Sequence, residues 1–143
     1  MSARRAPRYF TLEEALRLLP DVEQTIRRLR RIRDEIVALR QTVEGQWAGL
    51  EDDPATLTGI GEDQQRLDRL ENEFGEAAAE LERRGVLLRD LEMGLVDFPS
   101  LAGQAEIFLC WKVGEPTIGF WHRMNEGYSG RKPLSALPGR RLH

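Results

Sequence analysis

The chain has 143 residues, of which 41% are hydrophobic and 31% charged, and its formal net charge is −3. This length fits one domain with a buried core, and no apolar run is long enough to suggest a membrane span. No apolar segment follows the Arg-rich N-terminus, so it does not resemble a secretory signal. The single cysteine, Cys110, excludes an internal disulfide, and we therefore expect a cytoplasmic protein.

The first part of the chain has the periodicity of a helix. Thr11 and Glu14 have the spacing of a capping box, and a short helix should run from there to Pro20. Apolar residues then recur at steps of three and four, which predicts a long helix over about 20–44. This first stripe consists of Val22, Ile26, Leu29, Ile32, Ile36, Leu39 and Val43.

The glycine-rich, acidic stretch Gly45–Gly61 interrupts this pattern and predicts a loop. A second helix is expected over about 62–84, ending at Gly85 in a left-handed cap. Two such helices joined by a loop should form an antiparallel hairpin. Their stripes leave apolar surface to cover, so we expect a homodimer formed through the helical part. The second stripe consists of Leu67, Leu70, Phe74, Ala77, Ala78 and Leu81.

After Gly85 the period changes from three-four steps to alternation. Strands are predicted at 86–88, Glu106–Val113 and Thr117–Arg123, with turn residues at 114–116. These strands should form a small antiparallel sheet that packs on the helices. We therefore predict an α+β fold in a single domain, 1–143. It comprises a helical hairpin with a short N-terminal helix (9–85), a small C-terminal antiparallel β-module (86–131) and a loose tail (132–143).

Several motifs, taken in order, are similar to those of the bacterial family catalogued as domain of unknown function 2203. The resemblance covers nearly the whole chain. It implies a small cytoplasmic bacterial protein and brings no established activity, although some members carry metal-binding labels in their names. The motifs are Phe10–Ala15, Leu18–Pro20, Arg89–Glu92, Gly94–Pro99, Leu109–Trp111, Gly114–Glu115, Trp121–His122, and Gly127 with Gly130 and Arg131.

A metal site is the main candidate within residues 90–131. Asp90, Asp97, Glu115 and His122 offer carboxylate oxygens and an imidazole, which suit Zn or Mn. We predict that they converge at one end of the sheet. A split is the alternative, with His122 beside Asp90 or Asp97 and Glu115 elsewhere. The spacing matches no known ligand motif, so purely structural hydrogen bonding also stays open.

Other features of this region have plainer interpretations beside the functional ones. Asp97-Phe98-Pro99 is typical of a turn, and Cys110 of a buried, inert thiol. Gly127, Gly130 and Arg131 can bind an anion through backbone N–H groups and a guanidinium, or can form a surface loop.

Nucleic acid is not an expected partner. The arginines within 27–33 lie around most of the first helix, outside its apolar stripe. Acidic residues of the second helix can pair with these arginines.

Two classes of function remain. The first is a non-enzymatic binding or scaffold module that self-associates and binds a metal ion, a small ligand or a protein partner. The second is a small metal-dependent hydrolase with Asp, Glu and His ligands. We favour the first because no nucleophile is paired with a base in the sequence and no ligand spacing is recognisable.

Overall fold

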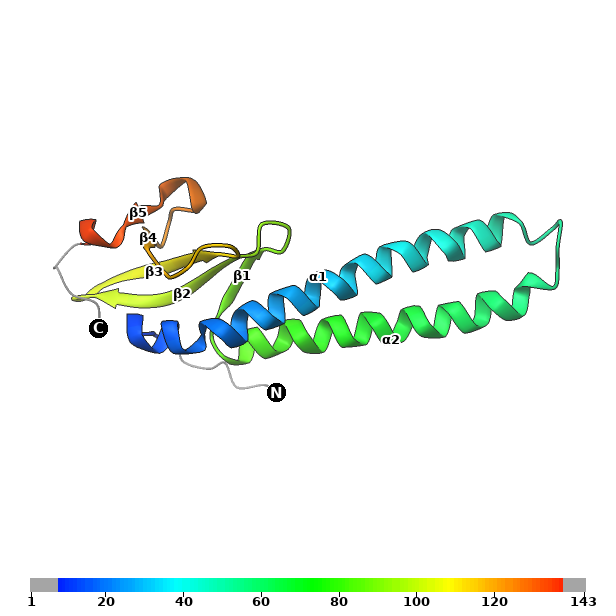
Figure 1. Ribbon diagram of the computed structural model, residues 1–143, viewed down its shortest axis with the longest axis horizontal. Coiled ribbons are helices and arrows are strands. Elements are labelled where there is room, and N and C mark those ends of the chain that lie inside the picture. Colours follow the sequence, from blue (N-terminus) through cyan, green and yellow to red (C-terminus); the bar gives the residue numbers. More distant parts are fainter. Residues whose placement is uncertain (1–7, 138–143) are drawn as a thin grey trace. The chain divides into compact units, whose positions relative to one another are not determined.

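A computed structural model describes residues 8–137, and Figure 1 shows the order of the elements. Two helices, α1 (Leu12–Ala48) and α2 (Thr56–Arg83), pack as a hairpin. They are followed by one five-stranded antiparallel sheet, which confirms the predicted α+β fold. The strands are β1 (Leu87–Asp90), β2 (Leu95–Ala102), β3 (Ala105–Lys112), β4 (Phe120–Arg123) and β5 (Lys132–Pro133).

The start of α1 has the predicted capping box. The Thr11 backbone N–H donates to Glu14 Oε1 at 2.8 Å, and the Glu14 backbone N–H donates to Thr11 Oγ1 at 3.0 Å. The expected short helix and the long helix after it are one helix, however, with Pro20 inside it. A proline removes a single helical hydrogen bond, and burial of Leu19 and Val22 on either side offsets that loss.

The end of α2 also follows its prediction. Gly85 has φ +84°, and the Val86 N–H donates to the carbonyl of Leu81 at 3.0 Å, closing a left-handed cap. The loop between the helices is shorter than predicted, because Gly45 belongs to α1 and Gly59 to α2. A glycine inside a helix costs only about 1 kcal/mol, which packing between the helices can offset.

The chain divides into two compact units. The hairpin unit, residues 27–79, has a core of buried aliphatic side chains from both helices. Ion pairing between Arg40 and Glu71, at 2.5 Å, also connects the two helices. The core residues are Ile32, Ile36, Leu67 and Leu70, with Leu39 and Phe74 packed against them.

The sheet unit consists of residues 8–26 and 80–137 in the described part of the chain. Its strands follow the order β1-β2-β3-β4-β5. Part of the expected loose tail belongs to this unit, since β5 pairs with β4 and the Trp121 indole N–H donates to the carbonyl of Pro133 at 3.1 Å. Residues 138–143 of the predicted tail lie outside the described residues.

The predicted turn at Asp97-Phe98-Pro99 is wrong, because these residues lie within β2. Pro99 is compatible with that strand for a geometric reason. Its carbonyl accepts a hydrogen bond from the Phe10 N–H at 2.7 Å. The nitrogen and carbonyl of one strand residue point to the same side, so the Pro99 nitrogen points away from β3. The missing N–H therefore costs no hydrogen bond between β2 and β3.

The sheet has one apolar face and one face with polar groups. The apolar face contacts the segment before α1, where the rings of Phe10 and Phe98 lie 5.3 Å apart and the Ser100 hydroxyl donates to the Phe10 carbonyl. The opposite face includes Asp97, Cys110 and His122. Alternation along the strands separates these two sets of side chains. The buried residues of the apolar face are Val96, Phe98, Ser100, Ala102, Ile107, Leu109, Trp111 and Trp121.

Candidate functional site

Three potential metal ligands meet on the polar face of the sheet. Asp97 of β2 lies directly opposite Cys110 of β3, and His122 of β4 lies opposite Phe108, two residues before Cys110. Asp97, Cys110 and His122 are 2%, 0% and 1% exposed, respectively. One ligand atom from each lies within 4.8 Å of the other two. The strand register thus assembles an oxygen, a sulfur and a nitrogen donor in the interior.

Asp97 and His122 form the centre of a hydrogen-bonded group. Asp97 Oδ1 lies 2.9 Å from His122 Nε2, and Asp97 Oδ2 accepts from Arg89 Nε at 2.8 Å. His122 Nδ1 lies 2.9 Å from the carbonyl oxygen of Arg123. A carbonyl can only accept, so Nδ1 carries a hydrogen. Nε2 faces a carboxylate oxygen, and a hydrogen bond there requires one further proton, shared between Asp97 and His122.

The thiol of Cys110 is protonated at neutral pH. Burial raises its pKa to about 12, and the nearby Asp97 carboxylate acts in the same direction. The guanidinium of Arg131 opposes this shift only in part. Without a metal ion, Cys110 is therefore a poor nucleophile, which agrees with the interpretation as an inert buried thiol.

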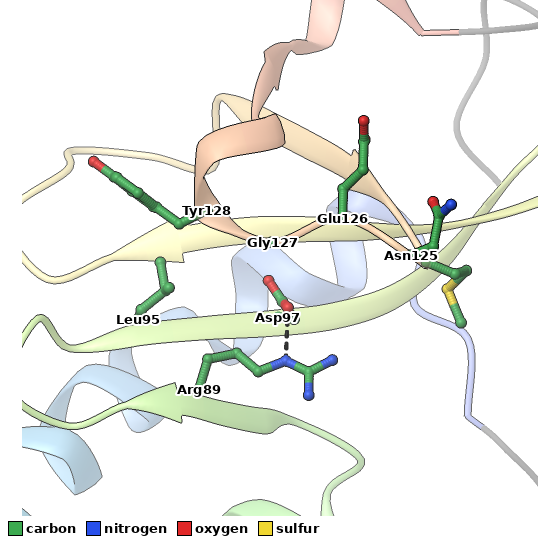
Figure 2. Close-up of a pocket in the computed structure, with 8 residues that line it drawn as sticks. Arg89, Leu95, Asp97, Asn125, Glu126, Gly127 and Tyr128 are labelled. Carbon is green, nitrogen blue, oxygen red and sulfur yellow. Dashed lines mark hydrogen bonds and ion pairs between the residues drawn. The ribbon is translucent and has the colours of Figure 1, made fainter.

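Asp97 also lines a cavity of about 390 Å³. Figure 2 shows its side chain pointing from β2 toward residues 125–128, with Arg89 alongside it. The cavity therefore borders the buried group at Asp97. It is lined by Arg89, Leu95, Asp97, Met124, Asn125, Glu126, Gly127 and Tyr128.

Of the four predicted metal ligands, Asp97 and His122 come together, and Asp90 and Glu115 do not join them. Asp90 accepts the Met93 backbone N–H at 2.9 Å in the turn between β1 and β2. Glu115 accepts from Arg131 Nη2 at 2.6 Å and from the Lys112 backbone N–H at 2.9 Å. The structure thus has the split arrangement. Convergence of all four fails because the turn residues already bind their own neighbours.

The polar environment of Glu115 is consistent with a structural ion pair. Burial alone raises the pKa of Glu115, but the Arg131 guanidinium and the Lys112 N–H outweigh it, and the pKa falls below its usual range. The carboxylate is therefore ionised at neutral pH and bound to a nearly buried arginine. This pair connects the turn after β3 to the segment before β5.

The residues of the predicted anion site are used within the protein. Gly130 N–H donates to the carbonyl of Gly127 at 2.9 Å, and Arg131 N–H donates to that of Tyr128 at 3.2 Å. The Arg131 guanidinium binds Glu115 and lies 4.1 Å from the centre of the Phe120 ring. These donors stabilise the short 3-10 helix η1 (Tyr128–Gly130) and its surroundings instead of facing an open anion cradle.

A family model matches residues 8–134 and carries the description "Uncharacterized conserved protein (DUF2203)". The chain belongs to the DUF2203 family. The motifs in the sequence thus identified the right family. No curated protein and no solved structure matches this DUF2203 chain. Within residues 8–137 no helix is both long and apolar enough to cross a membrane.

Sequence reasoning missed two members of the site in this DUF2203 protein. It did not predict Cys110 as a metal ligand, and it did not include Arg89. The alternation of β3 had placed Cys110 on one face together with Phe108. Pairing that face with the face of β4 that carries His122 would have brought the two side chains together. Recognising β2 as a strand would then have added Asp97. Arg89 lies on the neighbouring β1, where the register shifts between Leu88 and Asp90, and its side chain binds Asp97.

Proposed function

We propose that this protein is a non-enzymatic metal-binding module, with Asp97, Cys110 and His122 as the ligands of a zinc ion. The observation that carries the proposal is the approach of three chemically different donor atoms to within 4.8 Å of one another in the interior of the sheet. An oxygen, a sulfur and a nitrogen donor together suit Zn²⁺. The thiolate makes Mn²⁺ a poorer fit, because manganese prefers oxygen ligands.

The spacing of the donors fits a zinc ion after small side-chain adjustments. Zinc ligands lie about 2.0–2.3 Å from the ion, so tetrahedral ligands lie roughly 3–4 Å from one another. Binding replaces the proton shared by Asp97 and His122 and releases the proton of the Cys110 thiol. The high pKa of Cys110 makes zinc affinity fall steeply toward acidic pH, since the ion competes with that proton.

Neighbouring groups already hold the ligands in suitable orientations. The carbonyl of Arg123 holds a hydrogen on His122 Nδ1, which leaves Nε2 as the nitrogen that can bind metal. Arg89 binds Asp97 Oδ2 and leaves Oδ1 directed toward His122. Such outer partners fix the tautomer and rotamer of ligands in protein metal sites.

A small metal-dependent hydrolase is the second candidate, and one observation favours it. Three protein ligands leave a fourth coordination position, as in catalytic zinc sites, and Asp97 lines a cavity through which water can reach it. Glu126, the other acid in that cavity, is bound to Lys132 at 2.8 Å and is poorly placed as a base. Zinc-loaded protein that hydrolyses p-nitrophenyl acetate, with activity lost in His122→Ala, would favour the hydrolase.

Self-association through the hairpin unit is the second part of the proposal. Val37 is 46% exposed and lies beside Phe74 in a groove of about 290 Å³. The part of α1 within this unit is rich in arginine, whereas that of α2 is rich in acids. A second copy packed with α1 against α2 would cover the groove and pair opposite charges. The module would then hold two metal sites in one dimer.

The metal content of untagged protein tests the first part of the proposal. Wild type should purify with, or take up, one zinc ion per chain, and His122→Ala and Cys110→Ala should lose it. Asp90→Asn and Glu115→Gln are matched controls, because they neutralise acids outside the cluster and should retain the ion. Equal zinc binding by wild type and His122→Ala, or none by the wild type, would overturn the assignment.

A further inference from the structure

We propose that the cavity beside Asp97 binds a small organic carboxylate. Arg89 would hold the carboxylate group, and the apolar part of the molecule would lie against Leu95, Met124 and Tyr128. This inference goes beyond metal binding and does not rest on it, because the recognising groups are different side chains of the same cavity.

Arg89 is held in position by two contacts. Its Nε donates to Asp97 Oδ2 at 2.8 Å, and its guanidinium lies 5.0 Å from the centre of the Phe108 ring. In the part of the chain that the structure describes, these are the contacts it makes, and its side chain is 43% exposed. The edge formed by the two Nη atoms is therefore available to a ligand. Two parallel N–H donors on that edge match the geometry of a carboxylate.

The charges around the cavity favour an anion. The Asp97 carboxylate binds both Arg89 and His122, so its negative charge does not neutralise Arg89 alone. Glu126 accepts from Lys132 Nζ at 2.8 Å and from the Arg123 backbone N–H at 2.9 Å, so its charge is already matched. The guanidinium thus contributes positive charge that the cavity's own acids do not fully cancel. The negative charge of a bound carboxylate would neutralise this remaining positive charge.

The rest of the cavity favours an organic molecule over an inorganic anion. Its volume, about 390 Å³, lies at the small end of the range of roughly 300–1,000 Å³ found for ligand pockets. Leu95, Met124 and Tyr128 give it apolar and aromatic walls. Met124 and Tyr128 are both partly exposed, so a bound ring or alkyl group can lie against them. Asn125, which also lines the cavity, adds a polar side chain to its walls (Figure 2).

Calorimetric titration with benzoate tests the proposal, in EDTA so that metal binding cannot contribute. Wild type should bind benzoate saturably, and benzamide, its neutral analogue, about tenfold or more weakly. Arg89→Met should lose about tenfold or more, and Arg89→Lys should be intermediate because it keeps the charge without the paired donors. Arg69→Met, which removes an exposed arginine of α2, is the matched control and should bind like wild type.

A second variant keeps the test decisive if Arg89→Met does not fold. Tyr128→Ala removes an exposed wall of the cavity and should weaken benzoate binding several-fold while phosphate binding, if any, stays unchanged. Three results would overturn the proposal: no benzoate binding by the wild type, equal affinity for benzoate and benzamide, or tighter binding of inorganic phosphate than of benzoate. Loss of zinc binding in His122→Ala would bear on the metal site alone.

Discussion

The carboxylate of Asp97 and the imidazole of His122 lie 2.9 Å apart inside the sheet, although 25 residues separate them along the chain. Both side chains are almost completely buried. Each polar atom of the pair has a partner, namely Arg89, Arg123 or the other member of the pair. Buried polar groups are tolerated when they are bonded in this way, and the proposed zinc ion would take the place of the shared proton.

Substitution of Asp97 tests the proton shared with His122. Asp97→Ala should lower the free energy of unfolding of the metal-free protein by about 3 kcal/mol, because His122 and Arg89 lose their common acceptor. Asp97→Asn should cost only about 1 kcal/mol, since its amide can donate to Nε2 of a neutral imidazole and accept from Arg89. Urea denaturation in EDTA measures both. Equal losses for the two variants would contradict this account of the hydrogen bonds.

The cap at the end of α2 gives a prediction about stability with a built-in control. Gly85→Ala should lower the free energy of unfolding by about 1–2 kcal/mol, because φ is +84° and a Cβ there would lie 3.1 Å from the Cβ of Arg8. Gly75→Ala, within α2 and with open space around it, should raise the same free energy by about 0.5–1 kcal/mol. Thermal or urea denaturation would refute the account if both substitutions shifted stability in the same direction.

Local signals made part of the fold predictable from the sequence. The capping box of Thr11 and Glu14 and the cap at Gly85 involve residues within a few positions of one another, so their chemistry is visible in the sequence. β2 was not visible, because Asp97-Phe98-Pro99 has the local chemistry of a turn. Its extended conformation depends on pairing with β3 and on the distant Phe10, which bonds to the Pro99 carbonyl.

The same limit applies to the site. Grouping His122 with Asp97 was a prediction that residue types could support, because an imidazole and a carboxylate bind the same metals. The exclusion of Glu115 depends on its bond to Arg131, sixteen residues away, and the inclusion of Cys110 depends on strand register. Local spacing in the sequence encodes neither of these. The register that places Cys110 opposite Asp97 could not be predicted, because the strand that carries Asp97 was not predicted.

The buried thiol gives a prediction about pH. The pKa of Cys110 is about 12 in the folded chain against an ordinary value of 9.0. The stability that comes from keeping this proton is fully present below pH 9 and is lost as pH rises toward 12, because the unfolded chain releases its proton first. In metal-free protein, the free energy of unfolding of wild type should therefore fall above pH 9 relative to that of Cys110→Ala. An unchanged difference between pH 8 and pH 11 would contradict the burial of the thiol.

Self-association has a prediction of its own. Val37→Glu places a charge in the exposed apolar groove of the hairpin unit and should shift a dimer to monomer in sedimentation at high micromolar concentration. Leu57→Glu is the control, since Leu57 is also exposed but does not line this groove. A wild type that sediments as a monomer, or a dimer that both substitutions leave intact, would reject the proposed interface.

The most direct test of the central claim, a metal site formed by Asp97, Cys110 and His122, is the absorption spectrum of the cobalt-substituted protein. Co²⁺ occupies zinc sites, and coordination by a thiolate produces a charge-transfer band in the near ultraviolet. One equivalent of Co²⁺ should produce this band in the wild type, zinc should displace it, and Cys110→Ala should lack it while Glu115→Gln retains it. A wild type without the band, or a band that persists in Cys110→Ala, would contradict the assignment.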